Sequence, residues 1–181
     1  MSLGGINIEF LEQYNPNEFT INDKGTLISA TVTRKSKDGT GKTPDKRRNE
    51  ISFRNGFSYN YRFKVKITGS QKNSIVNIWQ IKKLGDNFPI ISIGIKRGDS
   101  GNQLAYKKRD NPSITIDDAN EHDVYVNCKD GKLFIDSKLV TEFKPYIGES
   151  SICKFGIEAD YSNVDQPIQV IYSNIKLTKI N

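Results

Sequence analysis

The stretch "YNYRFKVKI", residues Tyr59 to Ile67, alternates large apolar side chains with polar and basic ones along its whole length. The apolar positions are Tyr59, Tyr61, Phe63, Val65 and Ile67, and the positions between them are Asn60, Arg62, Lys64 and Lys66. Because successive side chains of a strand point to opposite faces, this pattern predicts a β-strand that is buried on one face and basic on the other.

The same period of two recurs through most of the chain. Further examples are "IISIGIK" (90–96), "DVYVNC" (123–128), "CKFGIEADY" (153–161) and "PIQVIYSNIKLTKI" (167–180). In "KDGKLFIDSKLV" (129–140) the pair Asp130-Gly131 lies between two short strand-like runs, which is a strong hairpin signal. No segment of about ten or more residues shows a helical stripe, so the chain is predicted to be an all-β sandwich or barrel.

The length of 181 residues suits one domain. The opening "MSLGG" has neither a basic nor an apolar region of a signal peptide. We therefore interpret residues 1–5 as an expression scar and residues 6–181 as a single β-sandwich domain. No apolar run is long enough for a transmembrane helix, and we expect no membrane partner.

The net charge of the chain favours a class of binding partner but does not identify one. Lys and Arg number 27 and Asp and Glu number 21, which gives a net charge of +6. This excess favours a polyanion such as nucleic acid, an acidic polysaccharide or an anionic surface. An ordinary solvated surface explains the charge equally well.

The few cysteines and histidines exclude several kinds of site. Cys128 and Cys153 share the parity of apolar neighbours, so we expect buried free thiols, with a disulfide between neighbouring strands left open. His122 is the only histidine, which excludes a multi-histidine metal site within one chain. It also excludes a conventional Ser-His-Asp triad unless His122 serves it. We expect His122 to be an exposed loop residue.

A polar, basic loop is predicted over "RKSKDGTGKTPDKRR" (34–48). Part of it is similar to a phosphate-binding loop but has Ser36 where the first glycine is required. Pro44 and a charge run follow where a helix is needed, so nucleotide hydrolysis is not expected.

Three strand-like stretches carry polar residues that share one parity. In "RRNEISFR" (47–54) these are Arg48, Glu50, Ser52 and Arg54; in "NIWQIKK" (77–83) they are Gln80 and Lys82; in "CKFGIEADY" they are Lys154, Glu158 and Asp160. A carboxylate beside an arginine can hold the guanidinium rigid, which is useful for gripping a carboxylate substrate. The alternative is a surface ion pair of little energetic consequence.

Taken together, these stretches resemble the signature of the jelly-roll polysaccharide lyases, the group of alginate lyase, glucuronan lyase and heparin lyase I. That group has an R-x-E-L/V-R strand, a Q-I/V-H strand and a K-x-G-x-Y strand in this order. The matching segments here begin at Arg48, Gln80 and Lys154, and the resemblance runs from Arg48 to about Leu177. It implies a concanavalin-like β-jelly-roll sandwich of two antiparallel sheets.

The resemblance also implies a reaction, β-elimination on a uronic acid polymer, which makes the chain a carbon–oxygen lyase. By motif, Arg48 and Gln80 would hold the substrate carboxylate, Glu50 would orient Arg48, and Lys154 would line the groove. Arg54 has the parity of the motif's second arginine, whose own position holds Ser52.

The catalytic positions depart from the family pattern. Lys82 stands at the histidine position, and as a base it needs a pKa below its usual ~10.4, to which partial burial, Lys83 and Arg48 could contribute. Glu158 stands at the tyrosine position, where it could act as base or acid, or pair with Lys82 and leave both inert. Tyr161 has the opposite parity and is a catalytic candidate if the strand bulges.

The sequence therefore predicts a lyase acting on an acidic, uronic-acid-containing polysaccharide. The alternative is a non-catalytic carbohydrate-binding or structural β-sandwich module. Arg48, Gln80, Lys82 and Glu158 are expected on one concave face. We expect a monomer and, by family resemblance, secretion; nucleic acid is the least favoured partner. No cofactor is expected, although "TIDDANEHD" (115–123) leaves Ca²⁺ open beside an ordinary polar turn.

Overall fold

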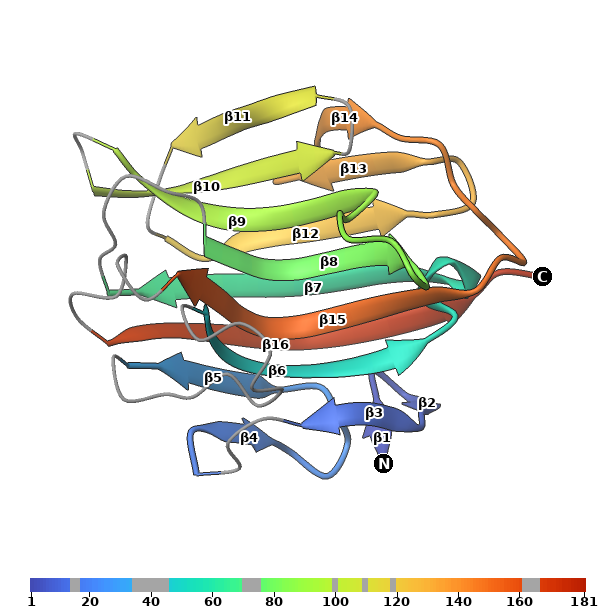
Figure 1. Cartoon of the computed structure of the whole chain (residues 1–181), viewed down its shortest axis with the longest axis horizontal. Coiled ribbons are helices and arrows are strands. Elements are labelled where there is room, and N and C mark those ends of the chain that lie inside the picture. The colour runs from blue at the N-terminus through green and yellow to red at the C-terminus, as the bar shows by residue number, and fades with distance from the viewer. Residues whose placement is uncertain are drawn as a thin grey trace.

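Alternation along the chain gives each sheet one apolar face, and the fold buries these faces against each other. The computed structural model describes residues 1–13, 17–33, 46–69, 76–98, 101–108, 111–117, 120–160 and 167–181. In this part of the chain, two seven-stranded antiparallel sheets are stacked; we call them the front sheet and the rear sheet from their places in Figure 1. The predicted all-β sandwich of two antiparallel sheets is confirmed.

The front sheet has the strand order β11–β10–β9–β8–β15–β6–β3. Its strands are β3 (Phe10–Gln13), β6 (Lys46–Arg54), β8 (Val76–Lys83), β9 (Ile91–Gly98), β10 (Gly101–Lys108), β11 (Asn111–Asp117) and β15 (Ser151–Asp160). Because β15 lies between β8 and β6, three segments that are far apart in sequence lie side by side at the centre of this sheet (Figure 1).

The rear sheet has the order β14–β13–β12–β7–β16–β5–β4. Its strands are β4 (Phe19–Ile21), β5 (Ile28–Val32), β7 (Tyr59–Thr68), β12 (His122–Asn127), β13 (Lys132–Ile135), β14 (Lys138–Glu142) and β16 (Ile168–Lys179). A short 3-10 helix, η1 (Gly56–Ser58), joins β6 to β7. The hairpin predicted at Asp130-Gly131 is the turn between β12 and β13.

Strand β7 shows why the alternation decides the fold. Tyr61, Phe63 and Val65 are fully buried, whereas Arg62 and Lys66 between and beyond them are exposed. The buried rings meet the front sheet, with Tyr61 5.4 Å from Trp79 and Phe63 5.4 Å from Phe155 between ring centroids. Edge-on aromatic contacts of this kind add to the free energy of burying the rings.

Two smaller sequence expectations have different outcomes. Cys128 and Cys153 are buried free thiols, as predicted, and burial raises the pKa of both. The expected exposure of His122 is wrong. His122 begins β12, continues the inward parity of Val124, and is only 5% exposed. Its Nδ1 lies 2.7 Å from Asp136 Oδ2, which satisfies a ring nitrogen that burial removes from water.

The first residues pack onto the sandwich. β1 (Ser2–Leu3) pairs with β2 (Ile6–Asn7), and Leu3 is fully buried. Gly4 donates its N–H to Gly25 O and accepts from the N–H of Leu177. The origin of residues 1–5 and the single domain over 6–181 stay predictions. None of the helical residues described forms a segment long and apolar enough to cross a membrane.

Candidate functional site

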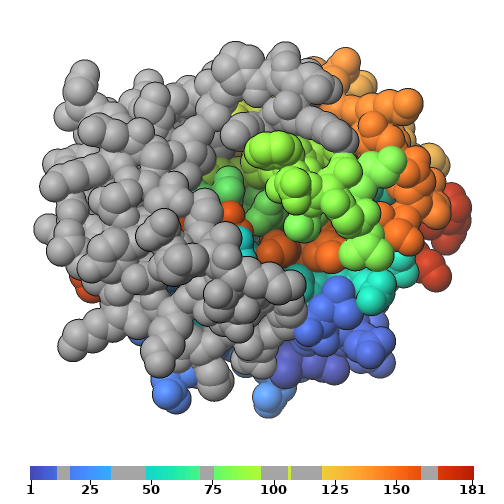
Figure 2. All heavy atoms as spheres, viewed as in Figure 1, coloured from blue at the N-terminus to red at the C-terminus, as the bar shows by residue number. Residues whose placement is uncertain are grey.

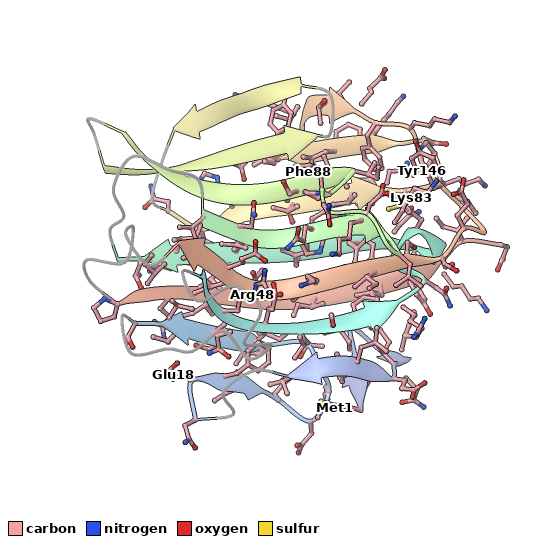
Figure 3. The ribbon with its side chains drawn as sticks, in the orientation of Figure 1. Met1, Glu18, Arg48, Lys83, Phe88 and Tyr146 are labelled. Carbon is pink, nitrogen blue, oxygen red and sulfur yellow. The ribbon has the colours of Figure 1, made fainter. Side chains whose placement is uncertain are left out.

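The site residues lie on the outer face of the front sheet, at its centre. In the strand register Arg48 of β6 is opposite Glu158 of β15, and Lys154 of β15 is opposite Gln80 of β8. Directly opposite residues of an antiparallel pair share a face, so all four project from the same side. Figure 3 labels Arg48, which lies over the middle of this face. Figure 2 shows atoms of β6, β8 and β15 in a hollow beside the segment 84–90.

Two ion pairs cross between β6 and β15. Arg48 Nε lies 3.0 Å from Glu158 Oε2, and Lys154 Nζ contacts Glu50 Oε1. The ion pair of Glu50 is with Lys154 and that of Arg48 is with Glu158, so the predicted orientation of Arg48 by Glu50 stays a prediction. Glu50 lies opposite Gly156, and Lys154 is its diagonal neighbour on the same face.

The Glu50–Lys154 pair is buried although it lies on an outer face. The side chains are 3% and 11% exposed, respectively. Burial raises the pKa of Glu50, and the neighbouring Lys154 ammonium acts against that rise. A buried ion is tolerated only with its partner in place, so each of these residues depends on the other.

Replacing Glu50 with leucine is expected to lower the free energy of unfolding by about 3–5 kcal/mol, because Lys154 is left buried without its carboxylate. The double variant Glu50→Leu, Lys154→Met should recover most of that loss. Urea unfolding of the three proteins measures both effects. Glu121→Leu is the matched control, since its pair with Lys64 is exposed (3.3 Å) and should matter by less than about 1 kcal/mol. Equal losses for Glu50 and Glu121 would contradict this account.

Gln80 completes a polar row across three strands. It is 6% exposed and lies opposite Lys154 on one side and Ser92 of β9 on the other. Ser92 is fully buried and was missed as a site neighbour by the sequence analysis. The signal was present, since Ser92 has the polar parity of "IISIGIK".

Lys82 is half-buried and lies among charges of both signs. Burial lowers its pKa, and so do the Lys154 ammonium and, more weakly, Arg48; Glu158 and Glu50 oppose them. The expected contribution of Lys83 is wrong, because Lys83 has the opposite parity. Its Nζ lies 2.6 Å from Glu149 Oε2 and 4.4 Å from the ring centroid of Tyr146, at the end of β8 (Figure 3).

Gly156 shapes the centre of the site. Its φ is +136°, and a Cβ there would lie 2.2 Å from Asn49 O and 2.4 Å from the Cα of Glu50. Between Phe155 and Glu158 the register of β15 shifts against β8, which marks a bulge. The glycine thus lets β15 approach β6 closely where the two ion pairs cross.

Tyr172 supports this bulge from the rear sheet. Its buried hydroxyl donates to Ile78 O and accepts from the N–H of Gly156 at 3.2 Å. It therefore joins the irregular parts of β8 and β15 from beneath. Nothing in the sequence indicates this role, because Tyr172 occupies one of the apolar positions of β16.

Three sequence expectations fall outside this group. Arg54 lies opposite Ile152 at the end of β6, is exposed, and lines a separate recess of about 190 Å³ near Tyr59. Tyr161 lies outside the described residues. The side chains of residues 115–119, within the Ca²⁺ candidate "TIDDANEHD" (115–123), also lie outside them. Among the described residues, no cluster of three or more His, Cys, Asp or Glu could hold a metal ion.

Comparison with known proteins identifies the fold. No protein-family model and no curated protein matches the sequence. Solved structures do match: alginate lyase AlgAT5 from Polysaccharide Lyase family 7 has a TM-score of 0.68 at 15% identity, covering 93% of this chain and 85% of that chain. Alginate lyase PA1167 from Pseudomonas aeruginosa gives 0.66 at 12% identity, covering 92% and 88%. The alginate lyase from Corynebacterium sp. gives 0.64 at 17% identity, covering 92% and 82%. The chain therefore has the jelly-roll fold of the family 7 alginate lyases, as the motifs predicted.

Proposed function

We propose that the chain is a polysaccharide lyase that cleaves an acidic, uronic-acid-containing polysaccharide by β-elimination. The observation that supports this most is the convergence of Arg48, Gln80 and Lys82 on one face, beside two ion pairs. In this reaction a guanidinium and an amide would hold the substrate carboxylate, and an amine with a lowered pKa would serve as the base. A solved structure of the family 7 alginate lyase A1-II′ with a bound substrate (GGMG) has the same fold, with a TM-score of 0.64 at 12% identity.

Substrate binding would exchange the partner of Arg48. The guanidinium now holds Glu158 at 3.0 Å, and both side chains keep some exposure, 18% and 15%. A uronate carboxylate entering the hollow would take over the N–H groups of Arg48, with the amide of Gln80 as second donor. Charge that develops on this carboxylate during proton abstraction is then stabilised where it forms.

In this proposal Lys82 is the general base of the reaction. Its neutral amine takes the proton from C5, and the electron pair moves into the enolate of the carboxylate. The C4–O bond then breaks, C4 and C5 become doubly bonded, and the leaving oxygen takes a proton from an acid. Glu158, released from Arg48, and Tyr161 stay the predicted candidates for that acid.

A non-catalytic binding module is the second candidate. The two ion pairs neutralise four of the site's charges without any substrate, and Lys82 stands where the related signature has histidine. Such a face could bind an acidic glycan and leave it intact.

The unsaturated product absorbs in the ultraviolet, which separates these candidates. Alginate, glucuronan and a heparin-type glycan should be screened with the wild type and with Gln80→Ala. Absorbance that grows with the wild type and is reduced in Gln80→Ala supports the lyase. Binding without growth on the whole panel would support the module instead.

The pH dependence should report the environment of Lys82. Only the neutral amine is a base, so kcat/KM should rise with pH through a pKa below the ordinary lysine value of about 10.4. Lys154→Met removes a positive charge that lowers this pKa, so the rising limb should move to higher pH. Lys129→Met, a lysine beyond the end of β12 in the rear sheet, is the control and should leave the limb in place. A limb that stays in place, or moves down, in Lys154→Met would count against Lys82 as the base.

A further inference from the structure

The outer face of the rear sheet, on the opposite side of the sandwich, carries a second ordered row of side chains. Phe134 of β13 is opposite Tyr125 of β12, Tyr125 is opposite Arg62 of β7, and Arg62 is opposite Lys176 of β16. Leu139 of β14, 52% exposed, extends the row beyond Phe134. With strands about 4.8 Å apart, the row from Phe134 to Lys176 is about 14 Å long.

One half of this row is aromatic. The rings of Tyr125 and Phe134 are stacked, with centroids 5.8 Å apart and planes at 25°. Both are half-buried on a face that otherwise points to solvent. Two stacked rings on adjacent strands form a rigid apolar ridge, and a sugar chain can bind to such a ridge at little cost in side-chain entropy.

The other half is cationic and hollowed. A recess of about 250 Å³ is lined by Asn60, Tyr61, Arg62, Tyr125, Lys176 and Thr178. Arg62 is held by Asp123 at 3.1 Å through one of its nitrogens, which leaves further N–H donors on a 60% exposed side chain. Lys176 is exposed and makes no ion pair with any residue that the structure describes.

We propose that this row, Phe134–Tyr125–Arg62–Lys176, is a second binding site for the acidic polysaccharide, separate from the front-sheet site. A carboxylate would bind in the recess between Arg62 and Lys176, and the neighbouring sugar would lie against Tyr125 and Phe134. The identity of the ligand rests on the proposed function, whereas the charge and shape of the row do not. A polymer held on both faces would stay attached between cleavage events, so the site would matter for long chains and not for short ones.

The test separates the two faces. Binding to alginate and to glucuronan is measured by affinity electrophoresis in a Lys82→Met background, which is expected not to degrade the polymer. Lys176→Ala and Tyr125→Ala should each weaken binding of the long polymer by about tenfold, equal to about 1.4 kcal/mol. Lys66→Ala is the control, since it removes the same charge from the same face outside the recess. With an active front site, turnover of short alginate oligosaccharides should be unchanged in all three variants.

Each outcome decides between the proposals. If the chain with an active front site cleaves the polymer, but Lys176→Ala and Tyr125→Ala bind it as well as the unaltered rear sheet does, the second site is overturned and the proposed lyase activity stands. No turnover on any polymer, with binding lost in both variants, would overturn the lyase and support the second site. Three further results would also overturn the second site. An equal loss of binding in Lys66→Ala would indicate unspecific charge, and equal binding of DNA of matched length would indicate a nucleic-acid surface. A change of oligomeric state in the variants would indicate contact between copies of the chain.

Discussion

Replacing Lys82 with methionine is expected to lower kcat for β-elimination by about 10²–10⁴-fold, the usual contribution of a positioned general base. The side chain is half-buried, and its lowered pKa increases the fraction of neutral amine at a given pH. Methionine keeps the length and the apolar stem but cannot take a proton. The change should therefore act on kcat and leave the unfolding midpoint in urea close to that of the wild type.

Lys83→Met is the matched control for this experiment. The two lysines are neighbours on β8, but Lys83 points to the other side and pairs with Glu149. Its replacement should leave kcat within about twofold of the wild type, because it touches none of the site residues. Similar rates for Lys82→Met and the wild type would remove Lys82 from the role of base, whatever the fold of the chain.

Replacing Gly156 with alanine is expected to destabilise the chain by more than about 5 kcal/mol, which places it among exceptional single substitutions. The new Cβ would lie 2.2 Å from Asn49 O and 2.4 Å from the Cα of Glu50. Both contacts are with backbone of β6, which cannot rotate away as a side chain can. β15 would have to separate from β6 at the point where both ion pairs cross.

Gly85→Ala separates the clash from the cost of the backbone conformation. Gly85 also has a positive φ, +89°, but no atom lies within 4 Å of a Cβ built there. It should lose only about 1–2 kcal/mol, the strain of the dihedral alone. Circular dichroism during urea unfolding measures both variants. Equal losses would show that close approach of the two strands does not set the cost at Gly156.

The fold could be predicted from the sequence because a period of two is a local property. It can be identified without knowing which strands pair with each other. The alternation in "YNYRFKVKI" determined both the strand and its buried face, and the Asp130-Gly131 turn placed a hairpin. The motif order suggested that three strands are neighbours. Parity within those strands then predicted that Arg48, Gln80 and Glu158 share one face.

The pairing inside the site could not be predicted, because it depends on the register between distant strands. Parity alone is consistent with Glu50 next to either Arg48 or Lys154. Only the alignment of β6 with β15 determines that Glu50 forms its ion pair with Lys154. The same limit hid Tyr172, whose hydroxyl reaches the bulge from the other sheet. His122 stands at a junction where two signals conflict: the neighbouring polar loop predicts exposure, and the parity shared with Val124 predicts burial, which the structure shows.

The masses of the fragments that the wild type releases from alginate or glucuronan test the central claim most directly. Elimination leaves each new non-reducing end one water lighter than hydrolysis would, because the C4–C5 double bond stands in place of the C4 hydroxyl and the C5 hydrogen. This account predicts that every fragment with a new non-reducing end lacks this water, that only the fragment from the original non-reducing end of each polymer keeps it, and that Lys82→Met forms no such fragments. Hydrated new non-reducing ends, or polymers that remain intact across the pH range of the Lys82 limb, would contradict it.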